Sequence, residues 1–158
     1  MKDVAEYLYY HEDQDYQYLK FMNCTYYRQK QRLLVRYYYH QDIEARLPVL
    51  KKRLEELFLQ QVNLPLKYEF VYKKVYIDAM TLQIEIVSFL CHKFSDLAKQ
   101  TTDEDVKVVF DNNVWQINLY LPAALLEFLT NSQQWQSFQQ ALRAKNFHEI
   151  IFYENVKN

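Results

Sequence analysis

The sequence contains no glycine among its 158 residues. Average usage of about 7% would give roughly eleven. Glycine provides the positive φ angles and the bare backbone from which phosphate-binding loops are built. Its absence argues against a Walker loop, a dinucleotide-binding fingerprint, a glycine-flanked serine elbow and a kinase glycine-rich loop. The sequence therefore argues against most of the familiar nucleotide-using and hydrolytic enzyme classes, and we expect no cofactor.

Cysteine and long apolar runs are also scarce. The two cysteines, Cys24 and Cys91, are too few for a disulfide framework and too isolated for a metal cluster. No apolar run reaches the roughly 18 residues that a membrane span requires, and the N-terminus lacks the apolar region of a signal peptide. A reducing cytoplasm is the compartment that these features favour.

Aromatic residues are abundant, with 15 Tyr, 10 Phe and 2 Trp, and half of the chain is apolar. This composition excludes disorder and indicates one globular domain or two small ones. The excess of Tyr, Asn, Lys and Gln is equally consistent with an AT-rich genome and with a functional use of the tyrosines.

The apolar pattern predicts an α+β fold made of two successive ββαβ units, each a small sheet with helices on one face. In the first half we expect a short helix within residues 1–22, strands at 24–27 and 33–39, a helix from 47 to 62 and a strand at 66–73. In the second half we expect a helix from 78 to 97, strands at 106–110 and 115–121, a helix from 122 to 142 that is open to a break near 131–132, and a strand at 147–153.

The predicted division is a leading acidic, tyrosine-rich segment (1–22), a first unit (23–77), and a linking helix with a second unit (78–158). The polar stretch 100–105 is a further candidate for a boundary. Arg28 to Gln31 is predicted as a hairpin turn. Asp111-Asn112-Asn113 is predicted as another, since Asn and Asp accept the left-handed conformation better than other residues that carry a β-carbon.

Groups that support metal or acid–base chemistry are dispersed. Cys91 and His92 are adjacent, and neighbours on a helix point in different directions, so we expect no metal site. The acidic groups at 12–15 and 103–105 lack the spacing of a calcium loop and are interpreted as solvated turns. Paired carboxylates from distant positions remain open, but the sequence singles out no pair.

Charge is distributed unevenly along the chain. The net charge is −4 over residues 1–16 and +6 over residues 28–53. Alternation along residues 33–39 places Arg32, Arg36 and Tyr38 on one sheet face, where cations could bind phosphates and tyrosines could stack on bases. The candidate nucleic-acid-binding residues are Arg28, Lys30, Arg32, Arg36, Tyr38, Arg46, Lys51 and Lys52. The alternative is a solvated sheet face and a charged helix exterior, over which the acidic N-terminal segment could fold.

Two stretches give the chain a resemblance to a known family. One is Arg32-Leu33-Leu34-Val35-Arg36-Tyr37 with the helix to Val62 and the strand to Tyr72. The other is Val108 to Tyr153, in which Trp115-Gln116-Ile117-Asn118-Leu119-Tyr120-Leu121-Pro122 leads into a long helix. This order resembles the N-terminal region of PolC-type bacterial DNA polymerase III α subunits, in which a domain similar to part of the clamp-loader tau subunit precedes a type II KH-like domain.

The resemblance implies a non-catalytic docking module of bacterial DNA replication. Its partners would be a clamp-loader or another polymerase subunit, together with single-stranded DNA, and a longer chain carrying it would be a DNA polymerase. The KH loop that grips nucleic acid is Gly-x-x-Gly, which this sequence cannot supply. The alternatives are a stand-alone single-stranded nucleic-acid-binding protein that uses the basic and tyrosine-bearing face, a structural interaction protein outside replication, and a small enzyme without a recognisable motif.

Overall fold

The computed structural model describes residues 3–98 and 100–157, and the chain divides into two compact units with the boundary in the sequence between Tyr76 and Ile77. Both units contain a three-stranded sheet and helices, so the predicted α+β class is confirmed. The polar stretch 100–105, a candidate boundary, lies inside the second unit. No helix in the described part of the chain is long and apolar enough to cross a membrane.

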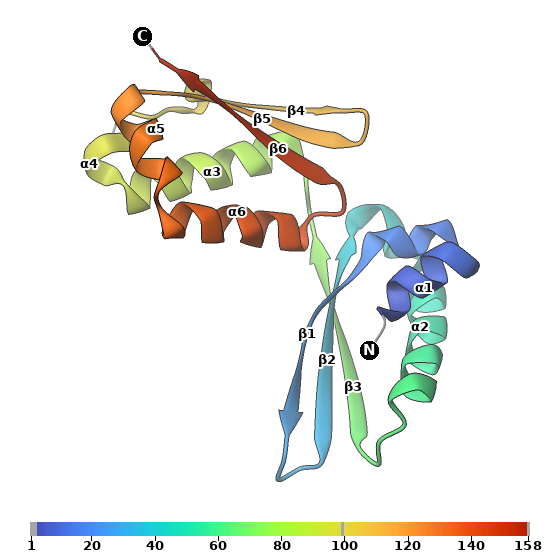
Figure 1. The fold of residues 1–158 in the computed structure, drawn as a ribbon. Helices are drawn as coiled ribbons and strands as arrows, with labels where there is room; N and C mark the ends of the chain where they lie inside the picture. Colours follow the sequence, from blue (N-terminus) through green and yellow to red (C-terminus); the bar gives the residue numbers. More distant parts are fainter. Residues whose placement is uncertain (1–2, 99, 158) are drawn as a thin grey trace. The chain divides into compact units, whose positions relative to one another are not determined.

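The first unit has the order helix, two antiparallel strands, helix and parallel strand (Figure 1). Its elements are α1 (Val4–His11), the short 3-10 helix η1 (Gln14–Tyr18), β1 (Leu19–Tyr27), β2 (Arg32–His40), the 3-10 helix η2 (Gln41–Arg46), α2 (Leu47–Val62) and β3 (Lys67–Val75). The strand order in the sheet is β1-β2-β3, and β2 is the central strand.

Helices α1 and α2 begin and end at residues suited to those positions. The Asp3 carboxylate accepts a 3.0 Å hydrogen bond from the Ala5 N–H and so caps α1. Pro48 lies in the first turn of α2, where its missing N–H costs nothing. Asn63 ends α2 in the left-handed conformation, at φ 42° and ψ 43°. Asparagine thus takes the place that glycine usually occupies after a helix.

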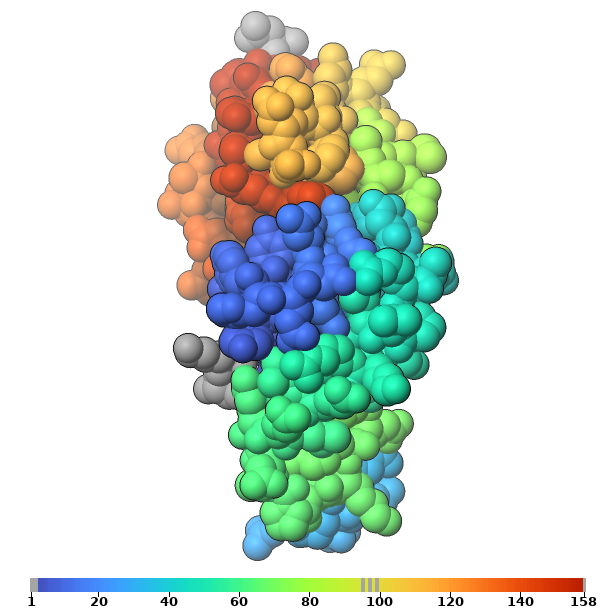
Figure 2. All heavy atoms as spheres, turned by 90° about the vertical axis from the view of Figure 1, so that its right-hand side faces the viewer, coloured from blue at the N-terminus to red at the C-terminus, as the bar shows by residue number. Residues whose placement is uncertain are grey.

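Both helices cover one face of this sheet. Leu8 of α1 and Leu54 of α2 are fully buried, as is Val35 of β2. Figure 2 shows α1, in dark blue, beside α2, in teal. The N-terminal helix that the sequence predicts is therefore part of the core of the first unit. In β1, a bulge between Phe21 and Asn23 shifts the register by one residue.

The second unit repeats this order of elements. Its elements are α3 (Ala79–Lys93), the short helix α4 (Ser95–Ala98), the 3-10 helix η3 (Asp103–Asp105), β4 (Val106–Asp111), β5 (Val114–Leu121), α5 (Ala123–Thr130), α6 (Gln133–Lys145) and β6 (Glu149–Val156). The strand order is β4-β5-β6, with β4 antiparallel and β6 parallel to the central β5. The sequence analysis allowed for a break in this helix near residues 131–132, and such a break separates α5 from α6.

Local signals in the second unit act as the sequence predicts. Asp78 and Thr81 form a reciprocal capping box at the start of α3. Asn112 and Asn113 have positive φ angles of 50° and 62°, so the β4–β5 hairpin forms without glycine. The alternate residues Ile117, Leu119 and Leu121 of β5 are fully buried. The ring of Phe89 stacks on that of Phe138, which joins α3 to α6.

Asn63, which ends α2 in the left-handed backbone conformation, allows a test of how the chain replaces glycine. Asn63→Val should lower the free energy of unfolding by about 1–2 kcal/mol, because a β-branched side chain is strained at positive φ. Asn63→Gly should match the parent chain or exceed it slightly. Urea unfolding followed by circular dichroism measures both. An equal loss in the two variants would show that the Asn63 side chain itself stabilises the turn.

Candidate nucleic-acid interface

The sheet of the first unit has one face that none of its own helices covers. Successive side chains of a strand point to opposite faces. Because Leu33, Val35 and Tyr37 contact the core under α1 and α2, the alternate residues Arg32 and Arg36 point to the other, open face. Tyr38 also occupies an alternate position of β2, so its side chain points to the same face as those of Arg32 and Arg36. The sequence prediction that these three side chains share one sheet face is confirmed.

Both neighbouring strands add polar and cationic groups to the open face. The β1 register places Lys20, Asn23, Thr25 and Tyr27 beside β2, and the parallel β3 register places Lys67, Glu69, Val71 and Lys73 on its other side. Lys67 lies opposite Arg32, and Lys73 lies opposite Tyr38. The open face thus carries five cations and one carboxylate from the three strands.

Contacts within this face hold the two arginines in place. Arg32 forms an ion pair with Glu69, and its guanidinium carbon lies 5.5 Å from the centre of the Tyr27 ring. Arg36 donates hydrogen bonds of 2.9 Å to Asn23 Oδ1 and 2.8 Å to Thr25 Oγ1. These bonds fix the side chain of Arg36 across β1 and β2, and both acceptors are uncharged side chains.

The predicted hairpin turn lies at one end of the open face. The Lys30 N–H donates to the Tyr27 carbonyl at 3.2 Å, and Gln31 adopts a positive φ of 49°. Arg28 and Lys30 are both exposed in this turn. The turn extends the cationic surface beyond the ends of β1 and β2.

The structure separates the remaining predicted residues from this face. Arg46, Lys51 and Lys52 lie at the start of α2 and in its second turn, on the helix-covered side of the sheet. The Lys51 ammonium lies 5.9 Å from the centre of the Tyr72 ring, and Tyr72 packs against the core beneath α2. The eight candidates therefore form two surfaces, one on each side of the sheet.

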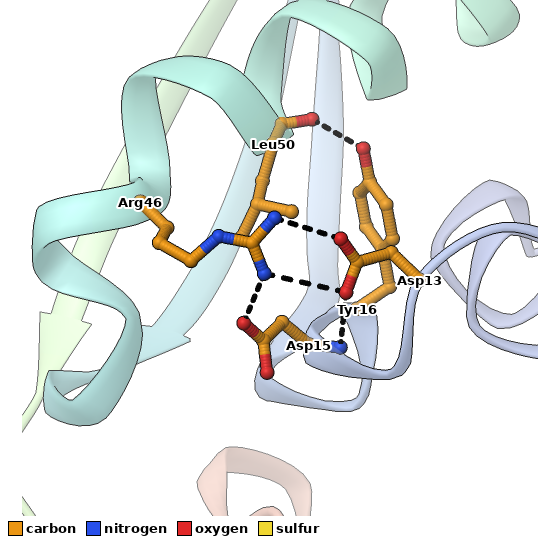
Figure 3. A network of polar contacts seen from close by, with 5 residues as sticks. All are labelled: Asp13, Asp15, Tyr16, Arg46 and Leu50. Carbon is orange, nitrogen blue, oxygen red and sulfur yellow. Dashed lines mark hydrogen bonds and ion pairs between the residues drawn. The ribbon is translucent and has the colours of Figure 1, made fainter.

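Acidic residues of the N-terminal segment pair with the helix-side arginines, and Figure 3 shows the pairing of Arg46 with Asp13 and Asp15. Arg46 contacts Asp13 at 2.8 Å and also pairs with Asp15, and Arg53 contacts Glu12 at 2.9 Å. The Arg46 guanidinium, together with the Asp15 N–H, holds the pKa of Asp13 below its ordinary value. The sequence anticipated that this segment could fold over the basic region, and it does so at these arginines.

The interpretation of the acidic groups as solvated turns is wrong for Asp105. Glu12 is exposed in its turn, and Asp13 and Asp15 remain about one-third exposed while they form the ion pairs described above. In the second group, Asp105 is only 5% exposed and lies 2.8 Å from the Lys157 ammonium. Burial alone would raise the pKa of Asp105, but the Lys157 and Thr102 hydrogen bonds lower it below its ordinary value. Asp105 also accepts from the Thr102 N–H at 2.9 Å, which closes the turn before β4.

Sequence reasoning missed the cations of β3. The alternation of polar and apolar residues along 66–73 places Lys67, Glu69 and Lys73 on one face of a strand, and this pattern was the sequence signal for them. It did not show that this strand lies parallel to β2 with Lys67 opposite Arg32. Tyr27 was missed for a similar reason, since only the bulge in β1 turns it toward Arg32.

Hollows in the second unit lie among its described residues. One, of about 620 Å³, lies beside the α5–α6 connection and has Glu127 as its ionisable side chain, next to Phe94 and Phe128. Another, of about 480 Å³, lies at the Asp105–Lys157 pair. Among the described residues, no group of three or more His, Cys, Asp or Glu side chains is arranged to hold a metal ion.

The contact between the N-terminal segment and α2 includes a buried tyrosine, whose contribution to stability can be tested by measuring unfolding at different pH values. Tyr16 is 3% exposed, and its hydroxyl donates a 2.8 Å hydrogen bond to the Leu50 carbonyl (Figure 3). Burial raises the pKa of Tyr16 to about 12, and the charges of Glu12 and Asp13 add to the rise. The folded state thus resists ionisation that the unfolded state allows from about pH 10.

We expect the free energy of unfolding to decrease as the pH rises from about 10 toward 12. Tyr16→Phe should lower it by about 1 kcal/mol at pH 7 through loss of the hydrogen bond. The same variant should make the alkaline decrease less steep, although Tyr37 and Tyr72, whose pKa values are also raised by burial, maintain part of it. Tyr10→Phe, at a position 70% exposed, is the control and should change neither quantity. An unchanged alkaline slope in Tyr16→Phe would contradict this assignment.

No protein-family model, no curated protein and no solved structure matches this chain.

Proposed function

We propose that the chain is a non-catalytic, cytoplasmic module that binds single-stranded nucleic acid on the open sheet face of its first unit. The observation that carries the proposal is the register of β1, β2 and β3. It places Arg32, Arg36, Lys67 and Lys73 on one surface with Tyr27. The same surface carries a single carboxylate, that of Glu69.

The chemistry of this face suits a single strand. Cations on neighbouring strands, which lie about 4.8 Å apart, can follow a flexible phosphate backbone. Exposed tyrosine rings stack on bases without regard to sequence. Tyr27 is 40% exposed, so part of its ring is available beside Arg32. Binding of this kind is electrostatic, tolerant of sequence and steeply dependent on salt.

The resemblance to the N-terminal region of PolC-type polymerases supports a role in bacterial DNA replication. In that setting the first unit would also dock a clamp-loader or polymerase subunit, and the second unit would be KH-like. A Gly-x-x-Gly loop cannot form in this chain, so the second unit is not proposed to grip nucleic acid as KH domains do. Nucleic-acid binding is instead assigned to the first unit.

A pair of double variants separates the two cationic surfaces. Lys67→Gln with Lys73→Gln removes two exposed charges from the open face, and Lys51→Gln with Lys52→Gln removes one partly buried and one exposed charge from the helix side. We expect the first variant to weaken binding to a fluorescent single-stranded DNA about tenfold in low salt. It should also reduce the slope of log affinity against log salt by roughly 1.4, since each phosphate contact contributes about 0.7.

The control variant should bind as the parent chain does. Fluorescence anisotropy at several salt concentrations gives the affinities, and circular dichroism confirms that both variants fold. Equal weakening in both variants would show diffuse attraction to the whole protein. Unchanged binding in the Lys67 and Lys73 variant, or no binding by the parent chain, would contradict the proposal.

A further inference from the structure

The two arginines of the open face differ in the groups that hold them. Arg36 donates hydrogen bonds to Asn23 and Thr25, and both of these side chains are uncharged. Arg32 is paired instead with the carboxylate of Glu69 on the neighbouring strand β3. A phosphate that approaches Arg36 meets a cation bonded to neutral groups, whereas at Arg32 it meets an ion pair. The two positions therefore bind phosphate in different ways.

The ion pair between Arg32 and Glu69 is exposed. The side chain of Arg32 is 34% exposed and that of Glu69 is 50% exposed. Ion pairs of this kind are screened by salt and contribute little stability, so another anion can replace the carboxylate at small cost. The pair joins Nη2 of Arg32 to Oε2 of Glu69, and Nε of Arg32 is buried with no hydrogen-bond partner among the described residues. A buried donor without an acceptor disfavours this arrangement, which also favours exchange.

The strand register places a second cation beside this pair. Lys67 lies directly opposite Arg32, and Glu69 follows two residues later on the same face of β3. A phosphate held between Lys67 and Arg32 therefore competes with the Glu69 carboxylate for the guanidinium. Guanidinium groups bind phosphate strongly, because they can donate two parallel hydrogen bonds to it. The Tyr27 ring, 5.5 Å from the guanidinium carbon, supports Arg32 in this position when the carboxylate leaves.

We propose that Glu69 is an internal competitor for phosphate, which a backbone phosphate of the bound strand displaces from Arg32. The phosphate then bridges Arg32 and Lys67, and the Glu69 carboxylate turns to solvent. One ion pair replaces another, so Arg32 adds less to affinity than a cation without a carboxylate partner would. The inference rests on the proposed function and concerns how the affinity of that same site is set.

Glu69→Gln tests the competition, because it removes the charge and keeps the size of the side chain. We expect it to tighten binding to a fluorescent single-stranded DNA about threefold in low salt, within the range that an exposed ion pair accounts for. The slope of log affinity against log salt should steepen by about 0.7, since Arg32 becomes one further phosphate contact. Fluorescence anisotropy at several salt concentrations measures both quantities.

Glu44→Gln is the matched control. Glu44 is 57% exposed and pairs at 2.7 Å with Lys74, which alternates with the open-face residues of β3. This variant changes the net charge of the protein by the same amount and should bind as the parent chain does. Equal tightening in Glu44→Gln and Glu69→Gln would reflect net charge alone and would overturn the proposal.

A double-mutant cycle with Arg32→Gln shows whether Glu69 acts through Arg32. In the Arg32→Gln background, Glu69→Gln should leave the affinity nearly unchanged, because no guanidinium remains to be released. Equal tightening with and without Arg32 would mean that Glu69 only repels the strand from a distance, and the competition would be disproved. Circular dichroism confirms that each variant folds.

The variant at Lys67 and Lys73 tests the proposed function separately. If the parent chain binds and that variant binds more weakly, but Glu69→Gln gains no affinity, the function stands and the competition is overturned. A parent chain that does not bind single-stranded DNA would overturn both.

Discussion

The parallel pairing of β2 with β3 is the constraint on which the first unit depends. A parallel connection must return over one face of the sheet, and here α2 makes that return. With α1 beside it, α2 buries one face of the sheet under Leu8 and Leu54 and leaves the other without a helix from the same unit. The same pairing brings Lys67 opposite Arg32, so it creates both the core and the cationic face.

Charge in the first unit is organised by this division into two faces. On the helix side, the arginines at 46 and 53 are neutralised by carboxylates of the N-terminal segment, and these pairs fasten that segment to α2. On the open face, Glu69 is the one carboxylate that β1, β2 and β3 place beside the cations. A region that reads as one basic block in the sequence is therefore two surfaces with different electrostatic character. Surface ion pairs contribute little stability by themselves, but here they determine which cations remain available.

The second unit uses the same order of elements for a different surface. In its sheet, Gln116, Asn118 and Tyr120 of β5 point to the face opposite the buried residues of that strand. Val109 lies beside them, and this face has little net charge. Phosphate recognition is therefore proposed for the first unit alone. The repeated topology positions the surfaces, and the side chains on alternate strand residues decide their chemistry.

The sequence by itself determined most of the helices, strands and turns, although β1 begins at Leu19 and not at residue 24. Apolar periodicity placed the helices, alternation placed the strands, and Asn63, Asn112 and Asn113 replaced glycine where positive φ was needed, because these preferences depend on neighbouring residues only. Tertiary structure decided which distant residues share a surface. The pairing of Arg46 with Asp13, the position of Lys67 opposite Arg32 and the ion pair of Arg32 with Glu69 each depend on strand order or on helix docking. Contacts between residues far apart in the chain leave no local pattern, so only the folded arrangement could reveal them.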